Sequence, residues 1–285
     1  MTYYKLQDWI PQDKLKWRNL SLNVNAIDYL ENNQELIDWD MLSNNPNAIN
    51  ILNTNYDKIN WYQLSGNPNA IGLLKSNLNK VNWYNLSSNP NAIEILENNL
   101  DLIEWKFLSF NSNAIHLIEN NLYKIDWFWL SFNPNAIHLR DKNLDKVDWY
   151  GFSTNPNAIH ILEQHLDKID WYGLSLNPNG INLLKLYPNK ICWYCLSCNP
   201  NAIEILQKNL DEVIWSRLSS NPNAIEILRY NIDKIDWYEF SSNPNIFIID
   251  YNKIKISRQL INQDIIEKAL HPLRVIKWIY ADFEF

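Results

Sequence analysis

Eleven tryptophans recur at an unbroken spacing of 22 residues, and this spacing constrains the fold more than any other feature of the sequence. They are Trp17, Trp39, Trp61, Trp83, Trp105, Trp127, Trp149, Trp171, Trp193, Trp215 and Trp237. A fixed short period means that each unit is one small structural element, which cannot bury its own apolar side chains. Neighbouring units must therefore stack into a continuous core, and the sequence predicts a tandem-repeat solenoid.

A typical repeat, residues 61–82, reads WYQLSGNPNAIGLLKSNLNKVN, and we number its positions from the tryptophan as 0. Position 4 is serine, and positions 6 and 8 are asparagine, in all eleven repeats. Asparagine followed by proline favours a helix start, because Asn caps the helix and Pro fits its first turn. Apolar residues at positions 9, 10, 13 and 17 follow at helical spacing and should face the core. The asparagine usual at position 16 should end this helix in a left-handed turn.

The residue before each tryptophan is usually Asp or Asn, which suits the cap of a shorter helix through the WYxLS segment. The sequence therefore predicts an all-α fold, an α-solenoid of about eleven two-helix repeats. A leucine-rich-repeat horseshoe is the alternative, because YxLSxN resembles the strand signature LxLxxN. The proline after that asparagine would interrupt a strand ladder, which favours the helical interpretation.

One register runs from about Trp17 to about Arg258, so residues 17–258 are expected to form a single elongated domain. Residues 1–16 should form an N-terminal cap and residues 259–285 a C-terminal helical cap, since the ends of a solenoid expose core surface. The tail holds two apolar stretches split at His271 and Pro272, and a docking motif for a host factor is the alternative.

The formal net charge of −7 is spread through the repeats as Asp and Glu interleaved with Lys. Nucleic acid is therefore not an expected partner, because binding to its backbone draws on clustered Lys and Arg. No apolar run approaches the length of a membrane span, and the first fifteen residues lack the apolar core of a secretory signal. We expect an intracellular protein that is not secreted.

The run LSxNPNAIxxLxxNxDKIDW resembles tandem repeats in proteins of mimivirus-like giant viruses. It is intact over residues 218–237 and nearly so over residues 152–171. In outline, the two-helix unit also resembles leucine-rich variant repeats. The resemblance implies a repeat architecture and a viral origin, with the host cytoplasm or the virion as location, and it brings no activity, cofactor or catalytic residue.

The serine and two asparagines of each repeat are predicted to be scaffold, because an active site needs one asymmetric constellation and these occur in eleven equivalent copies. No acid, base, nucleophile or phosphate-loop pattern stands out, so an enzyme and a cofactor are not expected. The tryptophans should lie in the core, each indole N–H bonded to a backbone or Asn oxygen.

Two groups of unusual residues lie in single repeats or short runs. Cys192, Cys195 and Cys198 form CxxCxxC, but a fourth ligand is missing nearby, so free thiols are expected instead of a metal site. His116, His138 and His160 occupy position 11 of three successive repeats. Stacked helices lie about 8–10 Å apart, too far for three such histidines to share one metal. An exposed stripe that touches a partner is the functional interpretation.

Aromatic residues at positions 1, 2 and 5 gather in repeats five and six: Phe107, Phe110, Phe128, Trp129 and Phe132. Together they would form an apolar patch halfway along the chain, either a binding hot spot or local packing. We expect a non-enzymatic scaffold that binds a protein or peptide, such as a host factor or another virion protein. A virion structural protein is the alternative. A one-base-per-repeat nucleic-acid reader is less favoured, because position 2 follows no code.

Overall fold

Two layers of short helices alternate along the chain in the computed structural model, which describes residues 3–140 and 143–269. The inner helices begin at the tryptophans: α1 (Trp17–Leu22), α3 (Trp39–Asn44), α5 (Trp61–Ser65), α7 (Trp83–Ser88), α9 (Trp105–Leu108), α11 (Trp127–Phe132), α13 (Trp149–Thr154), α15 (Trp171–Leu176), α17 (Trp193–Leu196), α19 (Trp215–Ser219) and α21 (Trp237–Ser241). The outer helices begin at position 10: α2 (Ile27–Glu31), α4 (Ile49–Thr54), α6 (Ile71–Lys75), α8 (Ile93–Glu97), α10 (Ile115–Glu119), α12 (Ile137–Arg140), α14 (Ile159–Leu162), α16 (Ile181–Leu186), α18 (Ile203–Lys208) and α20 (Ile225–Arg229). The predicted all-α solenoid is confirmed, and the strand-based horseshoe is wrong.

Local capping explains why these short segments become helical. The Asp or Asn before the tryptophan accepts a backbone N–H at the start of seven inner helices, as Asp148 does from Gly151 at 2.8 Å. The asparagine of position 6 accepts the N–H of position 8, and this Asn-Pro-Asn turn leads into an outer helix that starts only at position 10. Inner and outer helices both span 4 to 6 residues, so the expected longer second helix is not found.

The outer helix ends differently from the prediction. No described residue has a positive φ, so there is no left-handed turn at position 16. Instead the asparagine side chain there donates to the carbonyl four residues earlier, as Asn99 Nδ2 does to Ile95 O at 2.8 Å. A 3-10 turn follows at positions 17 to 19 in most repeats, and it carries the position-17 side chain out of the core. Leu100 is 51% exposed, so the expectation that position 17 is buried is wrong.

The core is a column between the two layers. Residues at positions 3 and 9, and the apolar residues at position 13, are fully buried or nearly so, for example Leu130, Ala136 and Leu162 at 0% exposure. The tryptophans are only half-buried and pack against the edge of this core. Within the described residues, none of their indole N–H groups makes the expected hydrogen bond. In five repeats the lysine of position 19 lies over the ring, as Lys58 Nζ does 4.4 Å from the Trp39 centroid.

The invariant polar residues bond each repeat to the one before it. Asn111 Nδ2 donates to the carbonyls of Ser87 and Asn89 at 3.0 and 2.9 Å, and Asn113 Nδ2 donates to Pro90 O at 3.0 Å. The serine hydroxyl of position 4 accepts the N–H of the residue before the next tryptophan, as Ser87 does from Glu104. These bonds recur at all eleven repeats, and the serines and position-6 asparagines are buried. They satisfy backbone groups that the short helices leave open.

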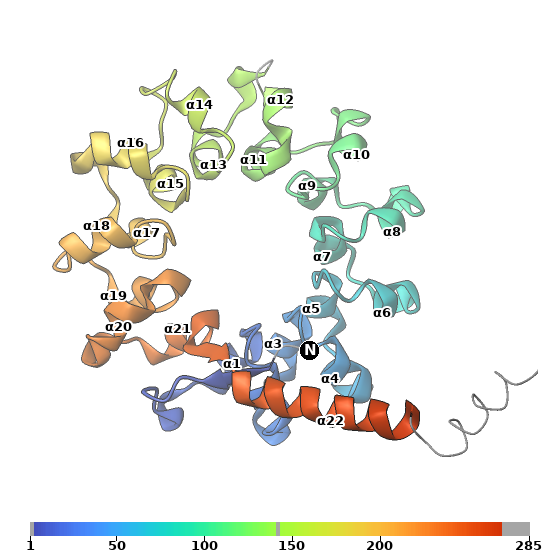
Figure 1. Cartoon of the computed structure of the whole chain (residues 1–285). Coiled ribbons are helices and arrows are strands. Elements are labelled where there is room, and N and C mark those ends of the chain that lie inside the picture. The colour runs from blue at the N-terminus through green and yellow to red at the C-terminus, as the bar shows by residue number, and fades with distance from the viewer. Residues whose placement is uncertain (1–2, 141–142, 270–285) are drawn as a thin grey trace, which may run out of the picture.

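The solenoid closes into a ring, so the expected elongated rod is wrong. Figure 1 shows α21 beside α1, with the inner helices around the centre and the outer helices on the rim. Asn23 Nδ2 donates to Ser241 O and Asn243 O at 3.1 and 2.7 Å, and Asn25 Nδ2 donates to Pro244 O at 3.0 Å. The last repeat therefore meets the first through the same bonds that join neighbours. Each repeat turns the chain by one-eleventh of a circle.

The two terminal segments meet at this seam. Strand β1 (Tyr4–Leu6) pairs antiparallel with β2 (Phe247–Ile249), which stands where the eleventh outer helix would begin. A closed ring has no open end for a cap to cover, and the described part of residues 1–16 joins the two ends instead. Helix α22 (Tyr251–Ala269) follows, so the boundary expected at residue 259 falls inside a helix. Residues 270–285, with the expected second apolar stretch, lie outside the described residues.

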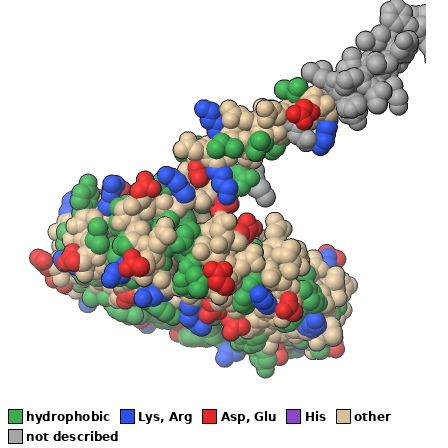
Figure 2. Space-filling model, turned by 90° about the horizontal axis from the view of Figure 1, so that it is seen from below, with side chains coloured by type: hydrophobic (Ala, Val, Ile, Leu, Met, Phe, Trp, Pro, Cys, Tyr) green, Lys and Arg blue, Asp and Glu red, His purple; other side chains and the backbone are tan. Residues whose placement is uncertain are grey.

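Helix α22 stands clear of the ring along most of its length (Figure 2). Its first turns are held by Lys253 Nζ, 2.8 Å from Asp28 Oδ1, and by a Tyr3–Ser257 hydroxyl contact at 3.4 Å. On the ring, acidic and basic side chains are interspersed over the visible face. Among the helices that the structure describes, none combines the length and apolar character needed to cross a bilayer.

Candidate functional site

The aromatic residues of positions 1, 2 and 5 lie on the side of the inner helices that faces away from the core. At about 100° per residue, position 3 and position 4 point together toward the outer layer, where both are buried. Positions 1, 2 and 5 then fall on the opposite half of each helix. This half faces the centre of the ring and the neighbouring inner helices (Figure 1).

The structure brings the five predicted aromatic residues together. Phe107 lies 6.2 Å from Trp129, Phe110 lies 6.4 Å from Trp129, and Phe128 lies 5.4 Å from Phe132, measured between ring centroids. Tilted and edge-to-face arrangements at these distances are favourable for aromatic pairs. Residues of α9 and α11 therefore form one continuous apolar surface.

This surface extends beyond the two predicted repeats through tyrosines of position 1. Tyr84 lies 5.4 Å from Phe107, Tyr150 lies 5.7 Å from Phe132, and Tyr150 lies 5.9 Å from Tyr172. We call the whole set the aromatic cluster: Tyr84, Phe107, Phe110, Phe128, Trp129, Phe132, Tyr150 and Tyr172. It crosses five inner helices, from α7 to α15. The tyrosine that follows the tryptophan in most repeats was the available sequence signal for this extension.

Members of the aromatic cluster differ in exposure. Phe110 and Phe128 are 46% and 44% exposed, whereas Phe107, Trp129 and Phe132 are half-buried and support them. Of the five predicted rings, three thus pack the inner helices together and two present apolar surface to solvent, as do Tyr84 and Tyr172 at 50% and 44% exposure. Lys106 Nζ lies 5.8 Å from the Trp129 centroid and places one positive charge beside the cluster.

Glycine at position 2 makes room for the cluster. A Cβ added at Gly151 would lie 2.7 Å from the Phe132 ring, and one added at Gly173 would lie 2.7 Å from the Tyr150 carbonyl oxygen. Both distances are too short for real atoms. The two glycines thus allow α11, α13 and α15 to approach closely, and they keep Phe132 on the centre-facing side.

Two tyrosines of the cluster, Tyr150 and Tyr172, have raised pKa values. Burial raises the pKa of Tyr150, and a hydrogen bond with the Cys195 thiol raises the pKa of Tyr172 to about 12. A group that titrates this high carries no charge near neutral pH. The aromatic cluster is therefore an uncharged surface, with Lys106 at its border.

The predicted histidine stripe lies in the other layer, on the outer helices. His116 Nε2 contacts Glu97 Oε1 and His138 Nε2 contacts Glu119 Oε1, both at 2.7 Å, while His160 is exposed on α14. Each of these glutamates stands at position 14 of the preceding repeat. Elsewhere the same two positions form the ion pairs Lys75–Glu94 and Lys185–Glu204. His116 and His138 thus take part in side-chain pairs between neighbouring repeats, separate from the aromatic cluster.

The three cysteines are free thiols around the inner helix α17. Cys195 is buried, and this burial raises the pKa of its thiol to about 12. Cys198 donates to Cys195 O and accepts from Arg217 Nη2, each at 3.2 Å. No group of three metal-binding side chains occurs in residues 3–140 and 143–269.

No family model, no curated protein and no solved structure matches this chain.

Proposed function

We propose that this protein is a non-enzymatic ring scaffold that binds a protein or peptide partner through the aromatic cluster. The exposed pair Phe110 and Phe128, set in an uncharged surface that crosses five inner helices, carries the proposal. Large aromatic side chains grouped at the middle of a surface are typical binding hot spots. Rings that already pack against one another lose little side-chain freedom on binding.

The surroundings support a polypeptide partner over a nucleic acid. Single-stranded nucleic acid needs a positively charged groove beside its stacking platforms. Lys106 is the single charged side chain at position 1 of the five helices that form the cluster, and the whole chain carries a net charge of −7. Because the serines and asparagines of the repeats are engaged in bonds between repeats, we also propose no catalytic role for them.

A viral origin follows from the resemblance of the repeat to those of mimivirus-like giant viruses, and it sets two candidate settings. As an adaptor, the ring acts in the host cytoplasm and binds a host factor. As a virion protein, it uses the same aromatic surface as an assembly contact. The adaptor is our first choice, because the aromatic cluster occupies one arc of the ring, whereas assembly contacts of a regular ring would be expected to repeat with its units.

The test is quantitative capture of partners from infected cells with a Phe110→Ser/Phe128→Ser variant. Both side chains are exposed, so the variant should keep its melting temperature within about 2 °C while losing at least tenfold in captured partner. The matched control is Tyr123→Ser/Tyr230→Ser, which removes two rings that are 81% and 82% exposed outside the cluster. A partner recovered equally with both variants contradicts the proposed site. Enrichment of the protein in purified particles would replace the adaptor with the virion role.

A further inference from the structure

The seam carries a second surface, independent of the aromatic cluster, along the outer edge of strand β2. Gln7 N donates to Ile246 O, and Asp250 N donates to Tyr3 O, at 3.0 and 2.8 Å. Because backbone groups alternate along a strand, residues 246, 248 and 250 face β1, and Phe247 and Ile249 face the other way.

Three of these outward groups have no hydrogen-bond partner in the described part of the chain: the N–H of Ile249 and the carbonyls of Phe247 and Ile249. The N–H of Phe247 is used, since it donates to Pro244 O. Unpaired groups at strand spacing form a template for a further strand. The side chains of Ile248 and Ile249, 43% and 37% exposed, add apolar surface at the same place.

The edge of β1 is closed by contrast. The outward N–H of Tyr4 donates to Asp28 Oδ2 at 3.0 Å, and α2 packs beside the strand. Asp28 in turn holds Lys253 of α22. In the described part of the chain, α2 thus covers the edge of β1, whereas the edge of β2 borders open clefts.

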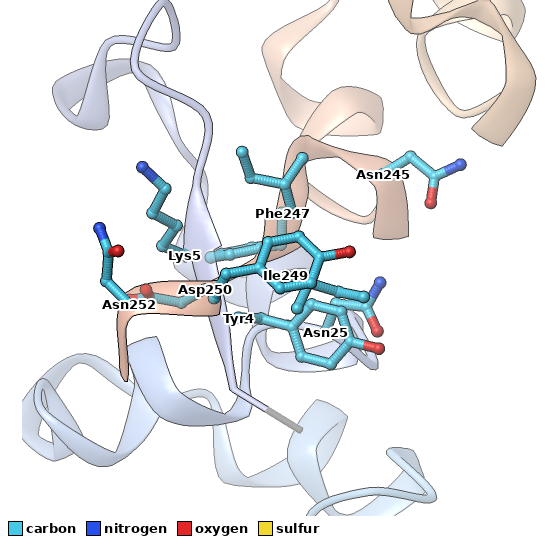
Figure 3. A pocket seen from close by; sticks show the side chains of 10 residues that line it. Tyr4, Lys5, Asn25, Asn245, Phe247, Ile249, Asp250 and Asn252 are labelled. Carbon is cyan, nitrogen blue, oxygen red and sulfur yellow. The ribbon is translucent and has the colours of Figure 1, made fainter. Parts of the chain in front are cut away.

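Two adjoining clefts lie along β2. The first, of about 620 Å³, is lined by residues that include Tyr4, Asn25, Asn245 and Ile249, and Figure 3 shows these four side chains around the strand. The second, of about 590 Å³, adds Ile203 and Ile225 of the neighbouring repeats. Phe247 and Ile248 line both. An added strand would thus lie between a cleft of mixed polar and apolar lining and a second cleft whose lining includes Ile203, Ile225 and Ile248.

We propose that the β2 edge is a docking site for an extended, apolar segment of another protein, which pairs with it as a third strand. The free N–H and carbonyls call for a peptide backbone, which offers acceptors and donors at the same spacing. The site continues an interface that already exists, because β1 occupies the opposite edge of β2 in this way. Aliphatic side chains of the segment fill the pockets beside Ile203, Ile225 and Ile248.

The probe is a fluorescein-labelled peptide, Lys-Val-Thr-Val-Thr-Val-Lys, titrated with the full chain by fluorescence anisotropy. Saturable binding is expected, together with an amide shift of Ile249 in nuclear magnetic resonance spectra. Two N-methylated peptides separate backbone pairing from apolar adhesion, since each blocks the donors of alternate residues. One of them should bind about tenfold more weakly, and the other like the parent, because only alternate residues face the edge.

A substitution in the protein tests the hydrogen bond that the outward N–H of Ile249 would donate to the peptide. Ile249→Pro removes the outward N–H and leaves the groups that pair with β1, so peptide binding should fall about tenfold. Ile249→Val keeps the N–H and should bind within about threefold of the native chain. Absence of saturable binding overturns the proposal, as does equal weakening by the two N-methylated peptides. Concentration-dependent dimers that compete with the peptide would show that a second copy occupies the edge, which also overturns it.

Discussion

The seam and an interior junction of the ring use the same inner hydrogen bonds and differ in their outer layer. At the junction of α9 and α11, Asn133 Nδ2 donates to Ser109 O and Asn111 O at 3.0 and 2.9 Å; at the seam, Asn23 makes the equivalent bonds at 3.1 and 2.7 Å. In the outer layer, an interior junction has one outer helix beside the next. At the seam, the paired strands β1 and β2 stand in place of the eleventh outer helix. Closure thus depends on the inner helices and on the turns at residues 23–25 and 243–245, and the outer helix can be replaced by a strand.

Truncation of the core should have the largest effect and should treat seam and interior alike. Leu20→Ala at the seam and Leu130→Ala in the interior each remove a side chain that is fully buried. Each should destabilise the ring by about 2–5 kcal/mol, because a cavity replaces the lost contacts. Denaturant unfolding of the two variants measures this. A seam variant that loses less than about 1 kcal/mol would show that the ring is open at that point in solution.

Loss of the asparagine bonds should sharpen the comparison. Asn23→Ala and Asn111→Ala each leave two buried carbonyls without their donor, and each should cost about 3 kcal/mol. Hydrogen exchange should separate them: Asn23→Ala should speed exchange in α1 and α21, and Asn111→Ala in α7 and α9. If hydrogen exchange became faster to the same extent in all repeats of both variants, the ring would open as one unit, whichever junction carries the substitution.

A smaller effect is expected at the close interior junction of α13 and α15. Gly173→Ala brings a Cβ within 2.7 Å of the Tyr150 carbonyl oxygen, a backbone atom that cannot rotate away. We expect a loss of about 1–2 kcal/mol from this overpacking. Gly72→Ala is the control, since nothing lies within 4 Å of the added atom, and it should be neutral or stabilising. Thermal melts of both variants measure the difference. Equal melting temperatures for Gly173→Ala and Gly72→Ala would contradict the close approach of α13 and α15.

Charge pairs should have the smallest effect, with opposite pH dependence in the two regions. Hydrogen bonds from Lys185 and Lys208 lower the pKa of Glu204 to about 2, so this interior contribution is present above the unfolded value of about 4.3 and disappears as pH falls toward 2. The bond to Asp28 raises the pKa of Lys253, so the seam contribution is present below about pH 10.4 and disappears as pH rises through the raised value.

Melting curves against pH check this pair of effects. In a plot of melting temperature against pH, Glu204→Gln should slightly reduce the fall at acid pH. Lys253→Met should reduce the fall at alkaline pH. Both changes should be small, because the partners are largely exposed and screened by solvent. A Lys253→Met variant with an unchanged alkaline limb would show that this clip does not hold α22 to the seam.

The sequence predicted the local structure of the repeat well, because invariant residues report local geometry. Asp and Asn before the tryptophans cap the inner helices, and the position-6 asparagines bind the preceding repeat. The prediction of a left-handed turn at the end of the outer helix was wrong. An asparagine at position 16 is equally compatible with a side-chain hydrogen bond to the carbonyl four residues earlier, which Asn99 and its equivalents make. The prediction that the tryptophans lie in the core failed for another reason, because a large ring can contact the core and still keep one edge exposed.

Ring closure was beyond the pattern of any single repeat. The angle between successive repeats depends on how closely the inner helices approach. Small residues such as Gly151 and Gly173 allow a close approach, but the resulting distance can be read only from the packed helices. One signal was present at the chain ends. Ser241, Asn23 and Asn25 keep the repeat pattern although an open solenoid would leave their bonding groups without partners. Likewise, the aromatic residues suggested a patch, while the division into supporting and exposed rings required the packed helices.

The one-eleventh turn of each repeat has a consequence for how such a gene can change. Near-identical tandem units are prone to gain or loss by unequal recombination, and an open solenoid tolerates either event by becoming longer or shorter. Here a chain of ten units would leave a gap, and a chain of twelve would overlap itself, so that the donor of Asn23 and the carbonyl of Ser241 no longer meet. The number of repeats is therefore tied to closure of the ring, because Asn23 and Ser241 meet only when the last repeat returns to the first.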